Sequence, residues 1–207
     1  MKVQAQAKLI LIRHGETKHN AAGKFQGHFD SELSKKGFQQ AEAVAKRVAS
    51  TAFAALYSSD LKRTMQTAQP IFQETRHAII ADARLRERDF GIFQNHSLRE
   101  IQEKFPEAHA KFSLQDPDYV IPQGESSNQL TKRVMAVFEE IANRHAGETV
   151  VIITHGGPIG ALLRYTLGLP YKALRRYSNY NTAFNIFFHK NGEWRLGTWG
   201  DISHLES

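Results

Sequence analysis

The sequence predicts an α/β protein of three layers, in which helices cover both faces of a mostly parallel central sheet. Three observations support this prediction. Short apolar segments rich in β-branched residues alternate along the chain with segments of helical periodicity. The segment ETVVIIT at 148–154 contains an apolar run that is typical of a strand buried on both faces. Near the C-terminal end, TAFNIFFHKNGEWRLGTWG predicts an antiparallel hairpin that turns at Asn191-Gly192.

The first part of the chain supplies three of the predicted strands and two helices. KLILI at 8–12 predicts a strand, and a helix follows over about 34–49. Four apolar residues of this helix share one face: Phe38, Ala41, Val44 and Val48. AALYSS at 54–59 predicts the second strand, and the helix DLKRTMQTAQPIF at 60–72 has a Ser/Asp N-cap signal at its start. A short strand at 78–80 leads into a charged loop.

Capping boxes mark two helices in the middle of the chain, at SLRE (97–100) and at SSNQ (126–129). The first of these helices is expected to end near Pro106. After the strand at 148–154, a helix over 156–168 has Pro158 in its first turn and Gly168 at its end.

The chain has 207 residues, and we expect residues 1–207 to form one domain of ordinary size. No linker, internal repeat or low-complexity segment divides it. A cluster of aromatic residues predicts a small helical cap over about 92–122, inserted into this domain. Its aromatic residues are expected to form the core of the cap, with a minority facing the functional site: Phe90, Phe93, Phe105, Phe112 and Tyr119.

No stretch approaches the roughly 18 consecutive apolar residues of a membrane helix, and the LILI run is too short for the core of a signal peptide. We therefore expect a cytoplasmic protein that has no membrane segment. The chain contains no cysteine and ten histidines. This composition excludes disulfides, thiolate nucleophiles and cysteine-ligated metal centres, and it makes histidine the candidate for covalent chemistry.

The formal net charge of +6 favours acidic partners such as phosphate esters, nucleic acid or anionic membranes. The basic residues are spread along the chain without a run of five or six. We therefore expect a small-molecule phosphate ester as the partner, and neither nucleic acid nor a membrane. We also expect no metal ion and no other cofactor, since no carboxylate cluster has the spacing of metal ligands.

Cationic and titratable residues follow each predicted parallel strand. They are Arg13, His14 and Gly15, then Asp60 to Arg63, then Arg84 to Arg88, and finally His155 with Gly156 and Gly157. Because ligands of open α/β sheets bind beyond the carboxyl ends of the strands, we expect these groups to meet at one edge. Taken singly, each is ordinarily a solvated arginine, part of a charged loop or a hydrogen-bonded histidine. Taken together, they suit phosphoryl transfer.

Five motifs give the chain a resemblance to a known family. They are LIRHGET at 11–17 followed by Asn20, SSDLKRTMQTA at 58–68, LRERDFG at 85–91, PQGESS at 122–127 and ITHGGPI at 153–159. In this order and spacing, the chain resembles the phosphatase branch of the histidine phosphatase superfamily, also called the phosphoglycerate-mutase-like family. The resemblance extends from residue 8 to the His-Leu pair at 204–205.

The resemblance implies a role for each matching residue. His14 would be the nucleophile that takes the phosphoryl group, and Glu87 would be the general acid and base. The residues that would hold the phosphoryl oxygens are Arg13, Arg63 and His155. Further residues that would bind phosphate or border the substrate are Asn20, Gln26, Gly27 and Gly156.

The residue types at these positions suit phosphoryl transfer through a histidine. Two guanidiniums and an imidazolium would supply positive charge around a phosphoryl group without a metal ion. The same cations oppose protonation of His14, so we expect a lowered pKa and a neutral nucleophile. We also expect one ring nitrogen of His14 to bond a backbone carbonyl, and a close backbone approach at Gly15. Glu87 needs a proton when the leaving group departs. This proton is either taken up when the substrate binds or brought by a phosphate monoanion.

Three functions remain open. The first is a phosphomonoesterase that hydrolyses a small phosphorylated metabolite through phosphohistidine. The second is a phosphoglycerate mutase with the same intermediate, and the third is a non-catalytic domain that binds a phosphorylated ligand or nucleic acid. The first is favoured over the second because only 38 positions separate Glu87 from Glu125, without the long arginine-bearing insertion of the family's mutases. The third is disfavoured because no catalytic position is missing.

The sequence leaves the natural substrate open among sugar phosphates, α-ribazole phosphate, phosphoglycerate and other esters. It also leaves the oligomeric state open, with a dimer as one alternative.

Overall fold

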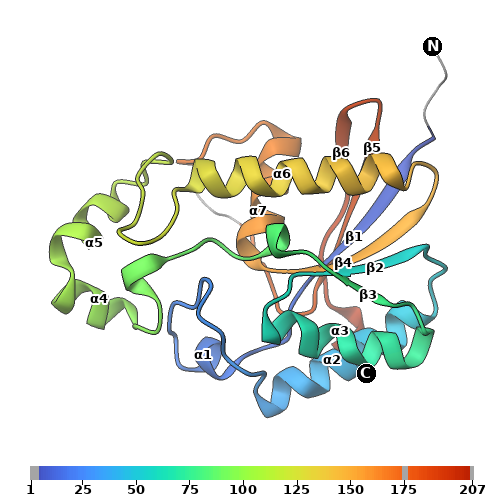
Figure 1. Ribbon diagram of the computed structural model, residues 1–207, viewed down its shortest axis with the longest axis horizontal. Helices are drawn as coiled ribbons and strands as arrows, with labels where there is room; N and C mark the ends of the chain where they lie inside the picture. The colour runs from blue at the N-terminus through green and yellow to red at the C-terminus, as the bar shows by residue number, and fades with distance from the viewer. Residues whose placement is uncertain (1–4, 174–176, 206–207) are drawn as a thin grey trace.

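The computed structural model describes residues 5–173 and 177–205, with helices on both faces of one sheet (Figure 1). In these residues the sheet has six strands in the order β3-β2-β4-β1-β5-β6. Their bounds are Ala7–Arg13 (β1), Ala55–Ser58 (β2), Ile79–Ala81 (β3), Thr149–Thr154 (β4), Phe184–Lys190 (β5) and Glu193–Asp201 (β6). The first four pair in parallel, whereas β5 is antiparallel to β1 and to β6. The predicted mostly parallel sheet with a C-terminal hairpin is confirmed.

Helices connect these strands. The longer ones are α2 (Lys35–Ala49), α3 (Lys62–Thr75), α6 (Ser127–Arg144) and α7 (Gly156–Leu167). The shorter ones are α1 (Lys18–Ala21), α4 (Leu98–Lys104) and α5 (Pro106–Ser113), with 3₁₀ turns at 83–85, 91–93 and 203–205. The predicted capping boxes at Ser97 and Ser126 are both formed. None of the described helices is both long and apolar enough to cross a membrane.

The two faces of the sheet carry separate hydrophobic clusters. In β1, Leu9 and Leu11 pack with residues of α6 and α7, whereas Ile10 and Ile12 pack with residues of α2 and α3. This alternation follows from the two-residue period of a strand. Figure 1 shows α6 above the sheet and α2 with α3 below it. Because both faces are covered, the central strand β4 is apolar along most of its length.

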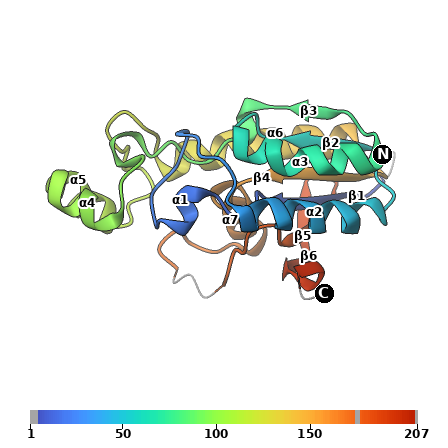
Figure 2. The same ribbon diagram turned by 90° about the horizontal axis from the view of Figure 1, so that it is seen from below.

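A third hydrophobic cluster lies at one end of the molecule, within the segment predicted as a cap. Phe93, Ile101 and Ile121 form its buried centre, and among the described residues it shares no member with the two clusters on the sheet. Phe25 packs on it from the N-terminal part of the chain. Figure 2 shows that α4 and α5 extend away from the sheet.

The prediction that Phe38 lies on the buried face of α2 is wrong. Its side chain is 46% exposed, whereas Gly37, Ala41 and Val44 face inward. The cause is a close approach at the start of the helix, where a Cβ on Gly37 would overlap the backbone of Glu16. The contact through Gly37 fixes the rotation of α2 and turns Phe38 to one side.

The predicted Ser/Asp cap of α3 is also wrong. The N-cap residue is Leu61, which has no side chain able to cap. The carboxylate of Asp30 accepts from the backbone N–H groups of Lys62 and Arg63 in its place. Asp60 bonds the guanidinium of Arg86, with 2.6 Å between Oδ1 and Nε. A loop distant in the sequence therefore supplies the cap.

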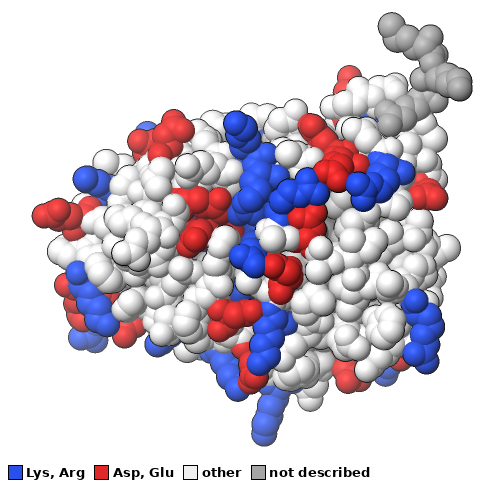
Figure 3. Space-filling model, viewed as in Figure 1, with Lys and Arg blue, Asp and Glu red and all other residues white. Residues whose placement is uncertain are grey.

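Charged residues of both signs lie together on the surface. Figure 3 shows a band of lysine and arginine down the middle of one face, with acidic side chains among them. Four ion pairs of the described residues have N–O distances of 2.5–2.6 Å: Lys62–Glu32, Arg84–Glu140, Arg86–Asp60 and Arg133–Glu125. Such paired charges differ from the continuous basic track that a nucleic-acid backbone requires.

Candidate active site

The structure brings the predicted site residues together at the carboxyl ends of β1, β2 and β4. His14 follows β1, Arg63 lies at the start of α3 after β2, and His155 follows β4. Because β4 lies between β1 and β2 in the sheet, these three strand ends are adjacent. The order of strands therefore places three distant motifs around one point.

His14 is buried and held in one orientation. Its Nδ1 lies 2.7 Å from the carbonyl oxygen of Gly15. A carbonyl can only accept, so Nδ1 carries the hydrogen and the lone pair is on Nε2. A Cβ on Gly15 would come within 2.6 Å of the carbonyl oxygen of Gly37, so this loop and the start of α2 approach closely. Both expectations for His14 and Gly15 agree with this geometry.

Burial, together with the Arg63 and Arg13 guanidiniums, holds the pKa of His14 well below its usual 6.5. The side chain is therefore neutral at physiological pH. A neutral imidazole has a lone pair on Nε2 that can attack phosphorus.

His155 lies fully buried behind His14, with 5.2 Å between the two ring centroids. Its Nε2 is 2.9 Å from Ser59 Oγ. Burial and the Arg63 charge hold the pKa of His155 well below 6.5. If the Ser59 hydroxyl donates to Nε2, then Nδ1 carries the N–H.

Two arginines face the same region, Arg63 buried and Arg13 partly buried. Arg63 is 1% exposed, and its terminal nitrogens donate to the carbonyl oxygens of Gly27 and Phe29 at 2.7 and 3.2 Å. Arg13 donates to the carbonyl oxygen of Asn179 at 2.5 Å. These bonds fix both guanidiniums in place.

Three buried donors in this region lack an acceptor among the described residues: Arg13 Nε, Arg63 Nε and His155 Nδ1. A buried donor without a partner costs about 1–3 kcal/mol. An anion with several oxygen atoms would satisfy all three, and a phosphoryl group has the required geometry and charge.

Glu87 is held by two backbone donors. Its Oε1 accepts from the N–H of Arg88 at 2.8 Å, and its Oε2 accepts from the N–H of Gly157 at 2.9 Å. Gly157 lies in the first turn of α7, where the helix dipole favours negative charge. The carboxylate therefore has a fixed position at the mouth of the site.

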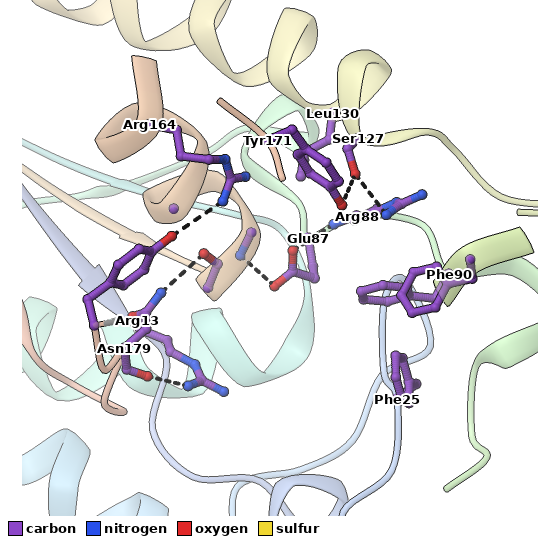
Figure 4. Close-up of a pocket in the computed structure, with 15 residues that line it drawn as sticks. Arg13, Phe25, Glu87, Arg88, Phe90, Ser127, Leu130, Arg164, Tyr171 and Asn179 are labelled. Carbon is purple, nitrogen blue, oxygen red and sulfur yellow. Dashed lines mark hydrogen bonds between the residues drawn. The ribbon is translucent and has the colours of Figure 1, made fainter. Parts of the chain in front are cut away.

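Two cavities meet at Glu87. The first, the His14 cavity, has a volume of about 270 Å³. The second, the Arg164 cavity, has a volume of about 500 Å³, and its lining residues are drawn in Figure 4. Four residues line both: Arg13, Phe25, Glu87 and Phe90. A ligand in the first cavity could therefore continue past Glu87 into the second.

The remaining predicted residues border these cavities in different ways. Asn20, Gln26 and Gly27 line the His14 cavity, and Gly156 lines the Arg164 cavity. Asn20 also forms a capping box, because its Oδ1 accepts from the N–H of Thr17 at 3.1 Å. This leaves the amide N–H groups of Asn20 as its donors toward the cavity. His155 lines neither cavity and contacts the site from behind His14.

Sequence reasoning missed several residues of the site. Phe25, Arg164, Tyr171, Tyr177 and Asn179 line the Arg164 cavity. Three of these lie between α7 and β5, a segment without a motif or a periodic pattern. Ser59 lies in the motif SSDLKRTMQTA, and its position directly after the buried strand β2 is the signal that could have identified it as a site residue.

Comparisons with known proteins agree with this geometry. The family model described as histidine phosphatase superfamily (branch 1) matches residues 9–202. The phosphoglycerate mutase-like protein 4 of Arabidopsis thaliana is 40% identical over 204 residues, which cover 97% of this chain and 87% of that protein. The metal-independent phosphoserine phosphatase of the same plant is 38% identical over 212 residues, covering 100% of this chain and 87% of that protein.

The solved structure of a phosphoserine phosphatase from Entamoeba histolytica, in complex with 3-phosphoglyceric acid, has a TM-score of 0.85 and 28% identity. The match covers 96% of this chain and 99% of that one.

Proposed function

The chain belongs to the histidine phosphatase superfamily, and on this premise we propose that it hydrolyses a small phosphorylated metabolite through a phosphohistidine on His14. The observation that carries the proposal is the state of His14. Its Nδ1–H is bound to Gly15 O, its Nε2 is unprotonated, and buried guanidinium donors lie around it. The relative named as a metal-independent phosphoserine phosphatase supports hydrolysis as the reaction.

In the first step, the phosphoryl oxygens bind Arg13 and Arg63 in the His14 cavity, and His155, which lies behind His14, offers its Nδ1–H to a third oxygen. His14 Nε2 attacks phosphorus from the side opposite the ester oxygen. The N–P bond forms as the ester P–O bond breaks, and Glu87 donates a proton to the departing oxygen. The products are phosphohistidine, an alcohol and the Glu87 carboxylate.

In the second step, water enters beside Glu87. The Glu87 carboxylate takes a proton from this water while the water oxygen attacks phosphorus. The new P–O bond forms as the N–P bond to His14 breaks. Inorganic phosphate leaves, His14 is regenerated, and Glu87 again carries the proton that the next turnover requires. The first proton comes from a phosphate monoanion or is taken up when the dianion binds beside the carboxylate.

The cap segment supports hydrolysis over mutase chemistry. A mutase has to hold the product while it reorients, and arginines between Glu87 and Glu125 would be the residues that hold it. This segment contains two arginines. Arg88 is buried and bonded to Glu125 O, Ser127 Oγ and Tyr119 O, whereas the Arg99 side chain is 87% exposed. Neither is placed to hold a reorienting product.

The test compares wild type with His14→Ala on an aryl phosphate and traps the intermediate. Wild type is expected to release phosphate and to form an acid-labile, alkali-stable phosphoenzyme, and His14→Ala is expected to do neither. His109→Ala, at a partly exposed histidine on α5 outside the site, is the matched control and should keep full activity. Phosphate trapped on serine or aspartate would overturn the assignment.

Hydrolysis and mutase turnover are then measured on one preparation with 3-phosphoglycerate. The proposal expects phosphate release to exceed isomerisation. A mutase rate well above the rate of phosphate release would favour the alternative that one relative's name suggests.

A further inference from the structure

The His-Leu pair at 204–205 is the part of the sequence resemblance to which the proposed mechanism gives no role. Both residues lie in the 3₁₀ turn at 203–205, and neither lines the His14 cavity or the Arg164 cavity. Figure 2 shows this turn at the end of β6, beside α2. The contacts of the His204 ring nevertheless lead to the backbone of His14.

Two carbonyl groups of the nucleophile motif are bound by residues 179–182, which we call the 179–182 corner. The N–H of Thr182 donates to the carbonyl oxygen of Arg13 at 2.9 Å. The side-chain amide of Asn181 donates to the carbonyl oxygen of His14 at 2.8 Å. On the other side, the N–H of His14 donates to the last residue of β4 at 3.0 Å. The backbone of His14 is therefore held between β4 and this corner.

The same corner also binds the Arg13 side chain and the start of α7. The carbonyl oxygen of Asn179 accepts from Arg13 Nη1 at 2.5 Å, and Asn179 Nδ2 donates to Gly156 O at 3.1 Å (Figure 4). The 179–182 corner therefore connects the residues that follow β1 with those that follow β4.

Thr182 has a backbone conformation that a threonine rarely adopts. Its φ is 57°, in the left-handed region, and the residue is fully buried. A β-branched residue is strained in this region, so the surrounding contacts have to hold it there. The N–H that binds Arg13 O belongs to this conformation. Contacts that hold Thr182 therefore also hold the nucleophile motif.

His204 supplies one of these contacts. Its Nε2 lies 3.4 Å from Thr182 Oγ1, and its Nδ1 lies 3.2 Å from Arg47 Nη1. Because an arginine can only donate, Nδ1 is the acceptor and Nε2 carries the hydrogen, which Thr182 Oγ1 accepts. The Thr182 hydroxyl in turn donates to the carbonyl oxygen of Asn181 at 2.8 Å. The hydrogen bonds thus run in one direction from α2 to the 179–182 corner.

The His204 ring is fixed in this orientation by the residues packed against it. Arg47 forms an ion pair with Asp201, and its guanidinium carbon lies 3.9 Å from the centre of the Phe184 ring. The His204 ring meets the Phe184 ring edge-on, with 5.5 Å between centroids. Burial, together with the Arg47 charge, lowers the pKa of His204 to about 4. The ring is therefore neutral at physiological pH and keeps its hydrogen on Nε2.

Resting on the proposed function, we propose that His204 is a positioning residue for the nucleophile. It holds Thr182 in the left-handed conformation, and through the 179–182 corner it keeps the backbone of Arg13 and His14 in place for the attack on phosphorus. The C-terminal turn thereby acts on the reaction from outside both cavities.

Binding of the phosphoryl oxygens depends largely on other contacts. The Arg63 guanidinium is held by the carbonyl oxygens of Gly27 and Phe29, which lie outside the 179–182 corner. Asn179, which holds the Arg13 guanidinium, has its own bond to Gly156 O. Loss of the His204 contact should therefore lower the rate of attack more than the affinity for phosphate.

The test measures kcat for an aryl phosphate and the inhibition constant of inorganic phosphate. His204→Ala is expected to lower kcat about 10- to 100-fold, the cost of a small displacement of a reacting group. The inhibition constant is expected to rise less than about threefold. His204→Gln places an amide N–H at the same reach as Nε2 and should recover most of the lost kcat.

A second variant removes the polar contact with less damage to packing. His204→Phe keeps a ring against Phe184 but has no N–H to donate to Thr182. It is expected to lower kcat as His204→Ala does, with a smaller fall in the thermal midpoint. This variant decides the question if His204→Ala does not fold.

A double-mutant cycle tests whether His204 acts through Thr182. Thr182→Val removes the hydroxyl and keeps both the β-branched shape and the backbone N–H. In this background, His204→Phe is expected to lower kcat by less than about twofold, because the contact is already lost. Losses that multiply in the double variant would contradict the route through Thr182.

His189→Ala is the matched control for stability. His189 is a buried histidine at the other end of β5 from the 179–182 corner, and its ring centroid lies 4.6 Å from that of Trp194. Its removal should lower the thermal midpoint and leave kcat unchanged when both are measured well below the midpoint. A fall in kcat that His189→Ala shares would assign the effect of His204 to stability alone.

The possible outcomes are distinct. Wild-type kcat in His204→Ala and His204→Phe, or a loss that His204→Gln does not recover, would overturn the positioning role. If the wild type still releases phosphate from the aryl ester, the phosphatase proposal survives that result. No phosphate release by the wild type would refute the phosphatase proposal and this inference with it.

Discussion

The backbone N–H of Gly157 donates to Glu87 Oε2 at 2.9 Å, so the first turn of α7 holds the carboxylate that we propose as the general acid. The same glycine leaves the space that the carboxylate occupies, because a Cβ at this position would overlap Oε1. One residue therefore both binds Glu87 and makes room for it.

Gly157→Ala should displace Glu87 and lower kcat for alkyl phosphates more than for an aryl phosphate. The reason is that an alkoxide needs a proton in order to leave, whereas a nitrophenolate does not. The measurement is the ratio of the two kcat values, with Glu87→Gln as the reference for a lost proton donor. Gly168→Asn, at the other end of α7 in open space with a left-handed φ of 62°, is the control. Equal losses on both substrates would contradict the assignment.

Arg63→Gln should lower kcat/KM by roughly 10²- to 10³-fold, the cost of losing one preorganised charge donor. It should also raise the pKa of His14, because Arg63 is one of the two cations that lower it. Arg63→Lys keeps the positive charge, so it should leave the His14 pKa low while still reducing activity. An NMR titration of the His14 ring in the free enzyme distinguishes the variants. A His14 pKa that does not move in Arg63→Gln would show that Arg63 does not contribute and that burial and Arg13 set it.

The free energy of unfolding should fall as the pH is lowered below about 6.5. His14 and His155 have lowered pKa values in the folded protein, so in this range the unfolded chain binds more protons than the folded one. Each histidine contributes a slope of up to about 1.4 kcal/mol per pH unit. Denaturant unfolding between pH 7 and pH 5 measures this slope. His155→Gln should flatten it, whereas His109→Gln, at a partly exposed histidine on α5, should keep it.

Chelation should leave the activity unchanged. Guanidinium and imidazole donors already surround the proposed phosphoryl position, and the described residues contain no group of three or more histidines and carboxylates suited to hold a metal ion. Turnover is measured before and after treatment with a chelator, and again with added magnesium. Activity that is lost in the chelator and restored by magnesium would refute this prediction.

The residues at the strand ends could be predicted because few arrangements of a parallel sheet are possible. Once β1, β2 and β4 are recognised as buried strands, His14, Arg63 and His155 have to lie near one edge. The local capping boxes at Ser97 and Ser126 could be predicted for a similar reason, since both partners lie within one turn of the chain.

Contacts between distant segments could not be predicted in this way. Asp30 caps α3 from a loop some thirty residues earlier, and nothing in its own neighbourhood indicates that partner. Tyr171 and Tyr177 reach the Arg164 cavity from a segment that follows α7 without a periodic pattern. Phe38 has the spacing of a buried residue, but the close approach at Gly37 decides the rotation of the helix.

The cap's own hydrophobic centre has a consequence for how such a protein diverges. Phe93, Ile101 and Ile121 pack with one another, so a substitution among them shifts Phe90 and Phe112, which reach both this cluster and the cavity wall. The strand-end residues around His14 rest on the sheet's own clusters and keep their places. Substitutions in this cluster can therefore change the leaving-group wall at Phe112, which lines the Arg164 cavity and not the His14 cavity.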